Sequence, residues 1–301
     1  MTESPRAARL TDRSFVSIAG PDRAKFLQGL VTNDIRRLKP DRALYAGFLT
    51  GQGKLICDLF ITEDRDRILV EIATAQLPEF LKRLAAFKLR AAVDVGEAAP
   101  AFAIAVAWGA QAAALLGLEP APGAAGRSSL AGAHGAFVDP RLAALGIRII
   151  YPIGHPLESE LTRLGFSSAT AADHAAYRLH FGVAEAAEIS GEACYPLEAN
   201  FEALNGVDFK KGCYVGQELT ARMKLKGQLR KRILPVTGAA PLPMPGTPVT
   251  AKGNDLGSLI AARGTQGLAL LRLDHLEGAQ EGALHARDVP LHVHWPDWLP
   301  R

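Results

Sequence analysis

The chain has 301 residues, enough for two or three domains with a sizeable core. With 48% hydrophobic and 22% charged residues it has the composition of a soluble globular protein, and its net charge of +3 is too small to indicate a general nucleic-acid binder. Its three cysteines form no CxxC pair and no disulfide framework, which favours a reducing compartment. The N-terminus lacks the apolar core of a signal peptide, and no apolar stretch of about 18 residues occurs. We therefore expect a cytoplasmic protein that is neither exported nor membrane-bound.

The first hundred residues predict an antiparallel meander of strands with two helices. One helix begins after Gly20-Pro21-Asp22, because proline is tolerated in a first turn and apolar residues then recur at helical spacing. Two strands flank the polar turn Thr50-Gly51-Gln52-Gly53-Lys54. The strands expected are 15–18, 44–49, 55–62 and 68–72, and a second helix is expected at about 76–88.

The middle of the chain alternates strands and helices, and its tail changes character near residue 232. Four prolines open the tail, and short apolar runs between glycine turns then predict a small β-barrel. Residues 109–136 are rich in Ala, Gly and Pro and predict a short helix followed by a flexible loop. The other elements expected are strands 102–108, 146–153, 257–263, 267–273, 282–287 and 290–295, and helices 156–164 and 171–181.

Two polar features of the N-terminal meander invite a functional interpretation. Gly51-Gln52-Gly53-Lys54 resembles part of a phosphate-binding loop, but Phe48 stands where that motif requires glycine and Leu55 where it requires a hydroxyl. A hairpin turn explains these glycines. Asp58 follows Cys57 between apolar residues, so one of the two side chains is expected to point inward. An inward Asp58 would suit proton transfer, and a solvent-facing Asp58 is an equal alternative.

The segment Lys211-Gly212-Cys213-Tyr214-Val215-Gly216-Gln217-Glu218 is the most informative stretch of the chain. Apolar residues four apart and a Glu218–Arg222 pair predict a helix after Gly216, so Cys213 is expected in a turn that leads into a helix N-terminus. The positive end of the helix dipole, together with Lys210 and Lys211, would favour thiolate over thiol. Such a thiol could be a nucleophile, a metal ligand or a redox group, and a buried, inert cysteine is the alternative.

Basic and thiol groups leave two further alternatives open. Eight basic residues between Lys210 and Arg232 could form a solvated face, or a site for an anion such as a polyglutamate tail, a phosphate or RNA. Cys57, Cys194 and Cys213 could together bind a metal, although their spacing matches no known ligand signature.

These motifs resemble those of the YgfZ family of folate-binding proteins, which act in iron–sulfur cluster maturation and are structural relatives of the glycine-cleavage T-protein, an aminomethyltransferase. The pattern is most similar to the mitochondrial-type branch, which assists late [4Fe–4S] assembly, and it implies a bacterial counterpart of that branch. The Lys-Gly-Cys-Tyr-x-Gly-Gln-Glu run is the most specific match. The matching segments, between about residues 13 and 235, are 26–35, 45–58, 196–200, 204–209, 211–222 and 229–232.

The resemblance implies an α+β fold of three lobes around a central channel. The first would be a discontinuous ferredoxin-like lobe, built from residues 1–42 and 103–232, that binds folate and carries the signature segment. The second would be an inserted α+β lobe of residues 43–102, and the third a C-terminal β-barrel of residues 233–301.

The resemblance also implies that tetrahydrofolate or a derivative lies in the channel. Lys211 would attract the folate carboxylates and lower the pKa of Cys213, and Asp58 would support chemistry near the folate amine. The T-protein has two aspartates where this chain has Cys57 and Asp58, and its Arg-Leu-Glu appears here as Arg178-Leu179-His180, so the chain departs from the aminomethyltransferase pattern twice. The other residues expected to bind the cofactor are Tyr45, Arg178, Glu198, Asn200, Gln217, Glu218 and Arg222.

We therefore expect a folate-binding accessory factor for the maturation or repair of [4Fe–4S] proteins rather than an enzyme. Cys213 would ligate a transient [2Fe–2S] or [4Fe–4S] cluster or exchange with a partner's thiol. Its partners would be iron–sulfur assembly proteins and [4Fe–4S] client enzymes. Two alternatives remain: a folate-dependent one-carbon transferase with Asp58 as base or charge stabiliser, and a tRNA-modification factor that uses the basic stretch.

Overall fold

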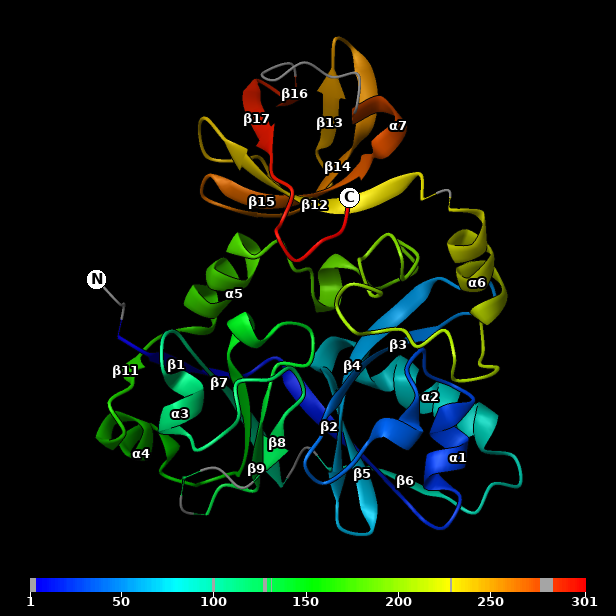
Figure 1. The fold of residues 1–301 in the computed structure, drawn as a ribbon, viewed down its shortest axis with the longest axis vertical. Coiled ribbons are helices and arrows are strands. Elements are labelled where there is room, and N and C mark those ends of the chain that lie inside the picture. The colour runs from blue at the N-terminus through cyan, green and yellow to red at the C-terminus, as the bar shows by residue number, and fades with distance from the viewer. Residues whose placement is uncertain (1–3, 99–100, 127–128, 131, 228, 277–283) are drawn as a thin grey trace.

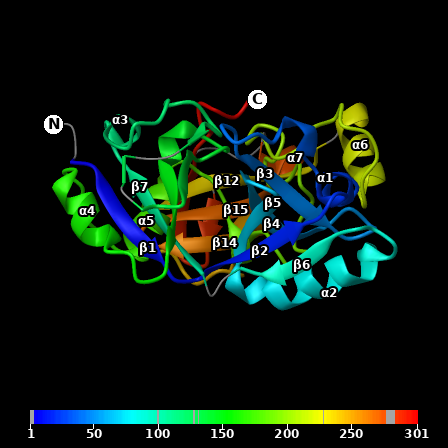
Figure 2. The same cartoon turned by 90° about the horizontal axis from the view of Figure 1, so that it is seen from below.

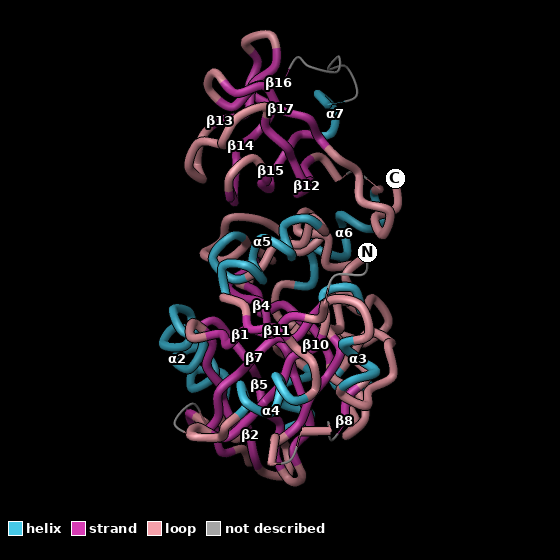
Figure 3. Tube along the Cα trace, turned by 90° about the vertical axis from the view of Figure 1, so that its left-hand side faces the viewer, coloured by secondary structure: helices cyan, strands magenta, loops and turns pink. Residues whose placement is uncertain are grey.

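A computed structural model of the protein describes residues 4–98, 101–126, 129–130, 132–227, 229–276 and 284–301. The architecture is mixed α+β, as expected. Two sheets lie side by side at one end of the molecule and a closed β-barrel stands at the other (Figure 1). Seen from the side, the barrel is a separate layer above the two sheets, with α5 between them (Figure 3). Among the helices of the described residues, none combines the length and the apolar character that crossing a membrane would need.

The N-terminal sheet has the strand order β3-β4-β5-β2-β6 and is antiparallel throughout. The predicted meander and both predicted helices are confirmed. Helix α2 packs its apolar side on the sheet, and the Phe48 and Phe80 rings meet edge to face with their centroids 5.1 Å apart. The elements are β2 (Arg13–Ala19), α1 (Arg23–Gln28), η1 (Ile35–Arg37), β3 (Leu44–Leu49), β4 (Leu55–Asp64), β5 (Arg67–Ala73), η2 (Thr74–Gln76), α2 (Leu77–Lys88) and β6 (Asp94–Glu97).

The second sheet has the strand order β11-β1-β7-β10-β9-β8 and lies beside the first (Figure 2). Its central strand β7 is almost continuously apolar, which suits a strand that is covered on both faces. The two predicted strands and the helices of this region are confirmed. Strands β1, β8, β9 and β11 were not expected, and β8 and the start of β9 lie where a loop was expected. The elements are β1 (Arg6–Leu10), β7 (Phe102–Trp108), α3 (Ala112–Leu115), β8 (Ala125–Gly126), β9 (Gly135–Val138), η3 (Ala143–Leu145), β10 (Ile147–Pro152), α4 (Leu157–Arg163), β11 (Ser167–Ser168), α5 (Ala171–His180) and η4 (Ala186–Glu188).

Strand pairing divides the chain differently from the expected boundaries at residues 42 and 102. Strand β2 pairs with β5 along seven residues and with β6 along four. Residues 13–19 are therefore part of the same sheet as residues 44–73, although the expected boundary separates them. Strand β1, which directly precedes β2 in the chain, pairs with β7 in the other sheet. The chain thus passes from one sheet to the other between β1 and β2.

The C-terminal part is a closed six-stranded barrel, as expected. Strands β12 and β17, the first and last in sequence, pair with each other and close it. The expected boundary at residue 232 falls inside β12, which the basic composition of this segment did not indicate. The elements are α6 (Gln217–Lys226), which precedes the barrel, and β12 (Lys231–Gly238), β13 (Pro248–Ala251), β14 (Asn254–Arg263), β15 (Gln266–Arg272), α7 (Leu273–Leu276), β16 (Leu284–Ala286) and β17 (Val289–Val293).

A buried ion network joins the two sheets. Glu71 on β5 lies between Arg13 on β2 and Arg148 on β10. Arg13 Nε is 2.7 Å from Glu71 Oε1, and Arg148 Nε is 3.0 Å from Glu71 Oε2. All three side chains are buried. Because Arg148 belongs to one sheet and its two neighbours to the other, this ion triad fixes how the sheets sit against each other.

The network extends into the loops beside the sheets. Arg141 Nη2 lies 2.7 Å from Asp139 Oδ2 and 2.7 Å from Glu185 Oε2. Burial alone would raise the pKa of Glu185, but the charges of Arg141 and Arg148 outweigh it and hold that pKa well below its usual range. The guanidinium carbons of Arg13, Arg141 and Arg148 pack around the ring of Phe60, at 5.5, 4.8 and 3.9 Å from its centroid.

His174 on α5 makes the stability of the fold depend on pH. It is buried beside Trp108, with the ring centroids 5.2 Å apart. Burial lowers its pKa to about 4; the charge of Glu185 opposes this shift and that of Arg148 adds to it. In the unfolded chain the pKa is about 6.5. Its contribution to stability is therefore complete above about pH 6.5 and is lost as the pH falls toward about 4.

A His174→Phe variant is expected to resist acid better than the wild type. Between about pH 7 and about pH 5 it should lose less of its free energy of unfolding, by about 2 kcal/mol, because no buried imidazole has to be protonated on unfolding. Urea denaturation at the two pH values measures the difference. Equal acid sensitivity of the two proteins would show that His174 is already charged in the native state.

Candidate functional site

The signature thiol lies at the surface, in the turn before α6. Cys213 is exposed, whereas Cys57 and Cys194 are buried. Burial raises the pKa of the Cys57 thiol well above its usual range and that of Cys194 to about 12, so both are inert. The three thiols do not form a common metal site, and no group of three or more His, Cys, Asp or Glu side chains in the described residues is placed to hold a metal ion.

The predicted turn and helix around Cys213 are confirmed, and two glycines explain their position. Gly216 is the N-cap of α6 with φ +79°, a conformation that other residues rarely adopt. A Cβ atom at Gly216 would lie 2.3 Å from the carbonyl oxygen of Thr50 and 3.0 Å from the Cα of Gly53. The glycine turn between β3 and β4 therefore packs backbone to backbone against the start of α6. The turn Gly51-Gln52-Gly53-Lys54, which resembles part of a phosphate-binding loop, thus has a packing role.

The N-terminal helix holds the thiol segment from the other side. The Val215 N–H donates to the carbonyl of Gly29 at 3.0 Å, and the Gln28 side-chain amide donates to the carbonyl of Lys211 at 3.1 Å. Cys213 lies between these two anchored positions. The exposed thiol is thus presented by a backbone that is fixed on both sides of it.

Lys211 has a different environment from the expected one. Its side chain is buried, and its ammonium group donates to the carbonyl of Gln28 at 2.7 Å and to that of Val31. Its Nζ also lies 4.7 Å from the ring centroid of Tyr214. Burial lowers the pKa of Lys211 to about 8, with the charge of Asp34 opposing the shift. The ammonium group caps the C-terminal end of α1 and does not face solvent, where a folate carboxylate would meet it.

Removing the Lys211 ammonium is expected to destabilise the fold. A Lys211→Met variant should lose about 2–3 kcal/mol of unfolding free energy, because two buried carbonyl groups lose their charged donor. Denaturant titration measures this loss, and Lys210→Met, at an exposed neighbouring lysine, is the matched control. Equal free energies of unfolding of the two variants would show that the Lys211 ammonium group stabilises the fold no more than an exposed lysine does.

The exposed side of α6 carries the other signature residues. The Gln217 side-chain oxygen accepts the Tyr214 N–H at 3.2 Å, and Arg222 pairs with Glu218 at 2.5 Å, the i,i+4 pair that the sequence predicts. Leu225 is 87% exposed, which is unusual for a large apolar residue. A shallow hollow on this side, which we call the thiol surface, is lined by Cys213, Tyr214, Gln217, Glu218, Ala221, Arg222 and Leu225.

Asp58 and Tyr45 lie in the interior, away from solvent. Both are fully buried on neighbouring strands β4 and β3, and the Tyr45 hydroxyl donates to Asp58 Oδ2 at 3.4 Å. The backbone N–H of Ala186 donates to Asp58 Oδ1 at 3.1 Å. Burial raises the pKa of Asp58, and the charge of Arg13 opposes the shift. The charge of Glu185 beside it adds to the upward shift of the Asp58 pKa. Cys57 is buried too, so both faces of β4 are covered.

The remaining expected residues lie in two other places. Arg178 on α5 forms a two-pronged ion pair with Glu188, both N–O distances being 2.7 Å. Asn200 donates to the carbonyl of Ile233 on β12 at 2.9 Å, and among the described residues its Oδ1 has no hydrogen-bond partner although it is buried. Glu198, two residues earlier, is half-buried, and burial raises its pKa.

The expected site residues thus fall into separate groups rather than one constellation. Cys213, Gln217, Glu218 and Arg222 share the thiol surface. Tyr45 and Asp58 form the interior pair, and Lys211 belongs to the packing of α1. The charged groups around that interior pair were not expected; of these, Arg13, Glu185 and Arg141 act on Asp58 most strongly. These residues are spread over about 170 positions, and charged residues usually lie on the solvated surface. The sequence therefore gave no signal that they would meet in the interior.

The interior has hydrogen-bonding groups of the kind that the pterin end of a folate uses, although two of its arginines also face carboxylates: Arg13 Nη1 lies 3.7 Å from Glu185, and Arg148 Nη1 3.8 Å from Asp139 and from Glu185. Buried arginine N–H groups that make no hydrogen bond among the described residues occur at Nη1 of Arg13, Arg141 and Arg148. Together with Asp58 and Tyr45 they offer donors and acceptors that suit a flat, hydrogen-bonding heterocycle. The carboxylate end of a folate fits less well. Lys211, the residue expected to attract the folate carboxylates, already donates to two backbone carbonyl groups.

Comparison with known proteins gives matches along the whole chain. It is 35% identical over 317 residues to the human protein "Iron-sulfur cluster assembly factor IBA57, mitochondrial", covering 97% of this chain and 85% of the human one. It is 31% identical over 292 residues to the Mycosarcoma maydis protein "Iron-sulfur cluster assembly factor IBA57 homolog, mitochondrial", covering 92% of this chain and 67% of that protein.

Two further comparisons concern the fold. Residues 230–301 match the family described as "CAF17, C-terminal beta-barrel domain", in agreement with the barrel of β12 to β17. The crystal structure of the glycine cleavage system aminomethyltransferase T from Bartonella henselae superposes with a TM-score of 0.79, covering 98% of this chain and 86% of that one. With 16% sequence identity, this likeness shows the aminomethyltransferase-type fold and not its activity.

Proposed function

Because this chain belongs to the family of the iron–sulfur cluster assembly factor IBA57, we propose that it is an accessory factor in the maturation or repair of [4Fe–4S] proteins, with Cys213 as its working thiol. One observation carries the proposal. Cys213 is the exposed one of three cysteines, and it lies on a backbone segment anchored on both sides. An inert structural cysteine needs neither property.

The chemistry of a lone thiol limits what Cys213 would do. A [2Fe–2S] or [4Fe–4S] cluster takes four ligands, so Cys213 would supply one thiolate and a partner protein the others. The alternative is exchange with a partner's thiol, in which the Cys213 thiolate attacks a disulfide sulfur and releases the other sulfur as a thiolate. In both cases the cluster or disulfide is cargo, and the partners would be assembly proteins or client enzymes.

Complementation tests this function. The chain is expressed in a strain that lacks its own assembly factor of this type, and the activities of several [4Fe–4S] enzymes are compared with that of a [2Fe–2S] enzyme. We expect recovery of the [4Fe–4S] enzymes by the wild-type chain, with the [2Fe–2S] enzyme unchanged throughout. Normal protein levels of the chain without recovery of any [4Fe–4S] enzyme would disprove the role.

We further propose that the interior around Asp58 and Tyr45 binds tetrahydrofolate, which would supply a one-carbon carrier there. The buried arginine N–H groups and the Asp58 carboxyl would hold the heterocycle. Titration calorimetry with tetrahydrofolate is expected to show binding that Asp58→Asn and Tyr45→Phe each weaken about tenfold, since each loses one buried hydrogen bond. Unchanged affinity in both variants would exclude this site.

One-carbon transfer is a second candidate, because a buried carboxyl with a raised pKa is suited to proton transfer. It predicts that methylene-tetrahydrofolate is consumed with turnover and that Asp58→Asn stops this consumption. Binding of the folate without turnover would instead assign it as a bound ligand of an assembly factor. The tRNA hypothesis stays a prediction, tested by whether tRNA binding occurs and falls steeply with salt.

A further inference from the structure

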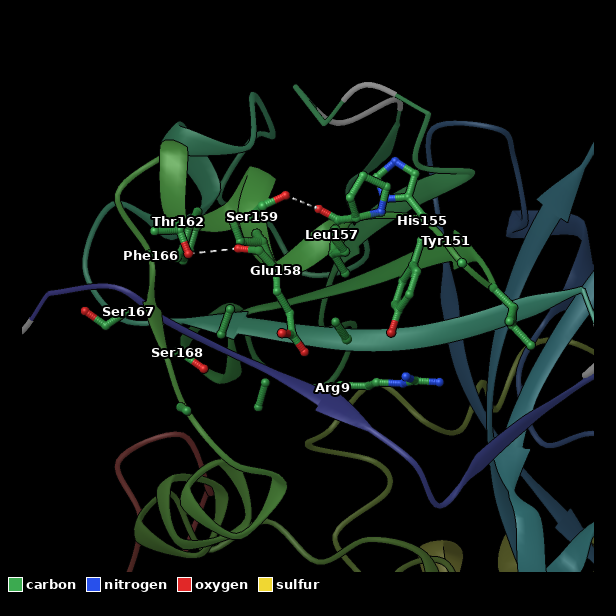
Figure 4. Close-up of a pocket in the computed structure, with 18 residues that line it drawn as sticks. Arg9, Tyr151, His155, Leu157, Glu158, Ser159, Thr162, Phe166, Ser167 and Ser168 are labelled. Carbon is green, nitrogen blue, oxygen red and sulfur yellow. Dashed lines mark hydrogen bonds between the residues drawn. The ribbon is translucent and has the colours of Figure 1, made fainter.

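A pocket on the outer face of the second sheet lies apart from both groups of proposed functional residues. It is about 460 Å³ in volume, within the roughly 300–1,000 Å³ typical of small-molecule sites. Helix α4 and the turn before it form one wall, and strands β1, β7, β10 and β11 form the floor and the opposite edge (Figure 4). No residue of the thiol surface and neither Asp58 nor Tyr45 lines it.

The floor of this pocket is flat and apolar. Ala7 on β1 and Ala105 on β7 are both buried and lie in one hydrophobic cluster with Leu161 and Phe166. Methyl groups in place of larger side chains leave room above the sheet, and the leucine and phenylalanine bound that room on the side of α4. A surface of this shape suits a large apolar or aromatic group that lies against the sheet.

The rim carries one charge of each sign, and the two do not neutralise each other directly. Arg9 on β1 and Glu158 on α4 both line the pocket, and they form no ion pair with each other among those of the described residues. Tyr151 also lines the pocket and is buried; burial raises the pKa of its hydroxyl, the charge of Arg9 opposes this shift and that of Glu158 adds to it. Figure 4 shows the Tyr151 hydroxyl and the Glu158 carboxylate both directed toward the strand that carries Arg9.

The other polar groups of α4 are already used. The Ser159 hydroxyl donates to the carbonyl of Pro156 and the Thr162 hydroxyl to that of Glu158, each at 2.8 Å (Figure 4). The charged groups that remain for a ligand are therefore the Arg9 guanidinium and the Glu158 carboxylate. The Tyr151 hydroxyl and the side chains of His155, Ser167 and Ser168 are the other polar groups that line the pocket. A ligand with a single charge would leave either Arg9 or Glu158 without an opposite charge. A zwitterion offers an opposite charge to both.

We propose that this pocket binds a free α-amino acid with a large apolar or aromatic side chain. Its carboxylate would lie on Arg9, its ammonium group on Glu158, and its side chain on the floor of Ala7 and Ala105. The Tyr151 hydroxyl would donate to the carboxylate beside Arg9. This inference does not depend on the thiol or folate proposals, because it shares no residue with them.

The test is titration calorimetry of the full chain with L-phenylalanine. We expect saturable binding that Arg9→Gln and Glu158→Gln each weaken at least tenfold, since each removes one charged hydrogen-bond partner. Arg163→Gln, on the solvent side of the same helix with 76% of its side chain exposed, is the matched control and should bind as the wild type does. Phenethylamine and 3-phenylpropionate, which each lack one charge of the amino acid, should bind at least tenfold more weakly.

Three results would overturn the inference. L-phenylalanine could fail to bind at millimolar concentration, or it could bind the Arg9→Gln and Glu158→Gln variants as tightly as the wild type. Equal affinity for the amino acid and its two singly charged analogues would show that the floor alone attracts apolar rings. Circular dichroism of the variants checks that all of them are folded, and both substituted side chains are exposed, so no loss of fold is expected.

Discussion

A Cys213→Ser variant is expected to abolish recovery of [4Fe–4S] enzyme activity in the complementation assay while remaining folded. Serine differs from cysteine by one atom but does not form a thiolate, so it binds iron weakly and exchanges no disulfide. The side chain is exposed and the turn is held by backbone contacts at Val215 and Lys211, so thermal stability should stay within about 0.5 kcal/mol of the wild type. We expect the [4Fe–4S] enzyme activity recovered with this variant to be below about a tenth of that recovered with the wild type.

The matched control is Cys194→Ser, which makes the same one-atom change at a buried cysteine. The Cys194 thiol donates to the carbonyl of Ile189 at 3.6 Å, and a serine hydroxyl keeps that donor. This variant should support the [4Fe–4S] enzymes as the wild type does. Full activity of Cys213→Ser would exclude every mechanism in which the thiol is bound or exchanged, and it would leave the folate proposal untouched.

A Glu71→Gln variant is expected to have the largest effect on stability. It keeps the size of the side chain but removes the charge that faces both Arg13 and Arg148, and so leaves two guanidinium groups buried with less compensation. Breaking a buried ion pair in this way costs about 3–5 kcal/mol. Denaturant titration should show this loss of unfolding free energy, together with weaker docking of the two sheets in hydrogen exchange of β2 and β10.

The control for this prediction is Glu97→Gln, an exposed glutamate on β6 of the same sheet. Its free energy of unfolding should change by less than about 0.5 kcal/mol. A double variant, Glu71→Leu with Arg148→Met, should recover part of the loss, because apolar residues of similar volume replace the Glu71–Arg148 pair. The recovery should be incomplete, since Arg13 stays buried with only Glu185, at 3.7 Å, to compensate its charge. If Glu71→Gln is as stable as Glu97→Gln, the Arg13 and Arg148 guanidinium groups are compensated by water and not by the Glu71 carboxylate.

Local patterns predicted most individual elements of the fold. The helix with Phe80 and Leu84 and the hairpin around Gly51-Gln52-Gly53 follow from spacing and turn chemistry, which act over a few residues. Strands β1 and β6 were missed because they are short and carry charged or small residues, and only their partners make them strands. The sheet to which β2 belongs depends on pairing with β5, about 50 residues away, and no local signal encodes this.

The candidate site was predictable as a segment but not as a set of contacts. The glycines and the helix start placed Cys213 in a turn before a helix, and the structure agrees; that the thiol is exposed rather than buried is seen only in the structure. Lys211 looked like a surface cation because lysine seldom is buried, yet carbonyl groups of Gln28 and Val31 bind it. Such a pairing joins residues about 180 positions apart, so it appears only when the chain is folded.

The contact between Gly53 and Gly216 also sets the order in which the protein can mature during synthesis. The hairpin turn and its sheet leave the ribosome long before α6, and closing a loop of about 160 residues is slow compared with forming the sheet itself. Cys213 is therefore fixed in its anchored turn only late, after most of the chain has emerged. A nascent or truncated chain would carry the thiol on an unanchored segment, so it would not yet display the surface that a partner must recognise.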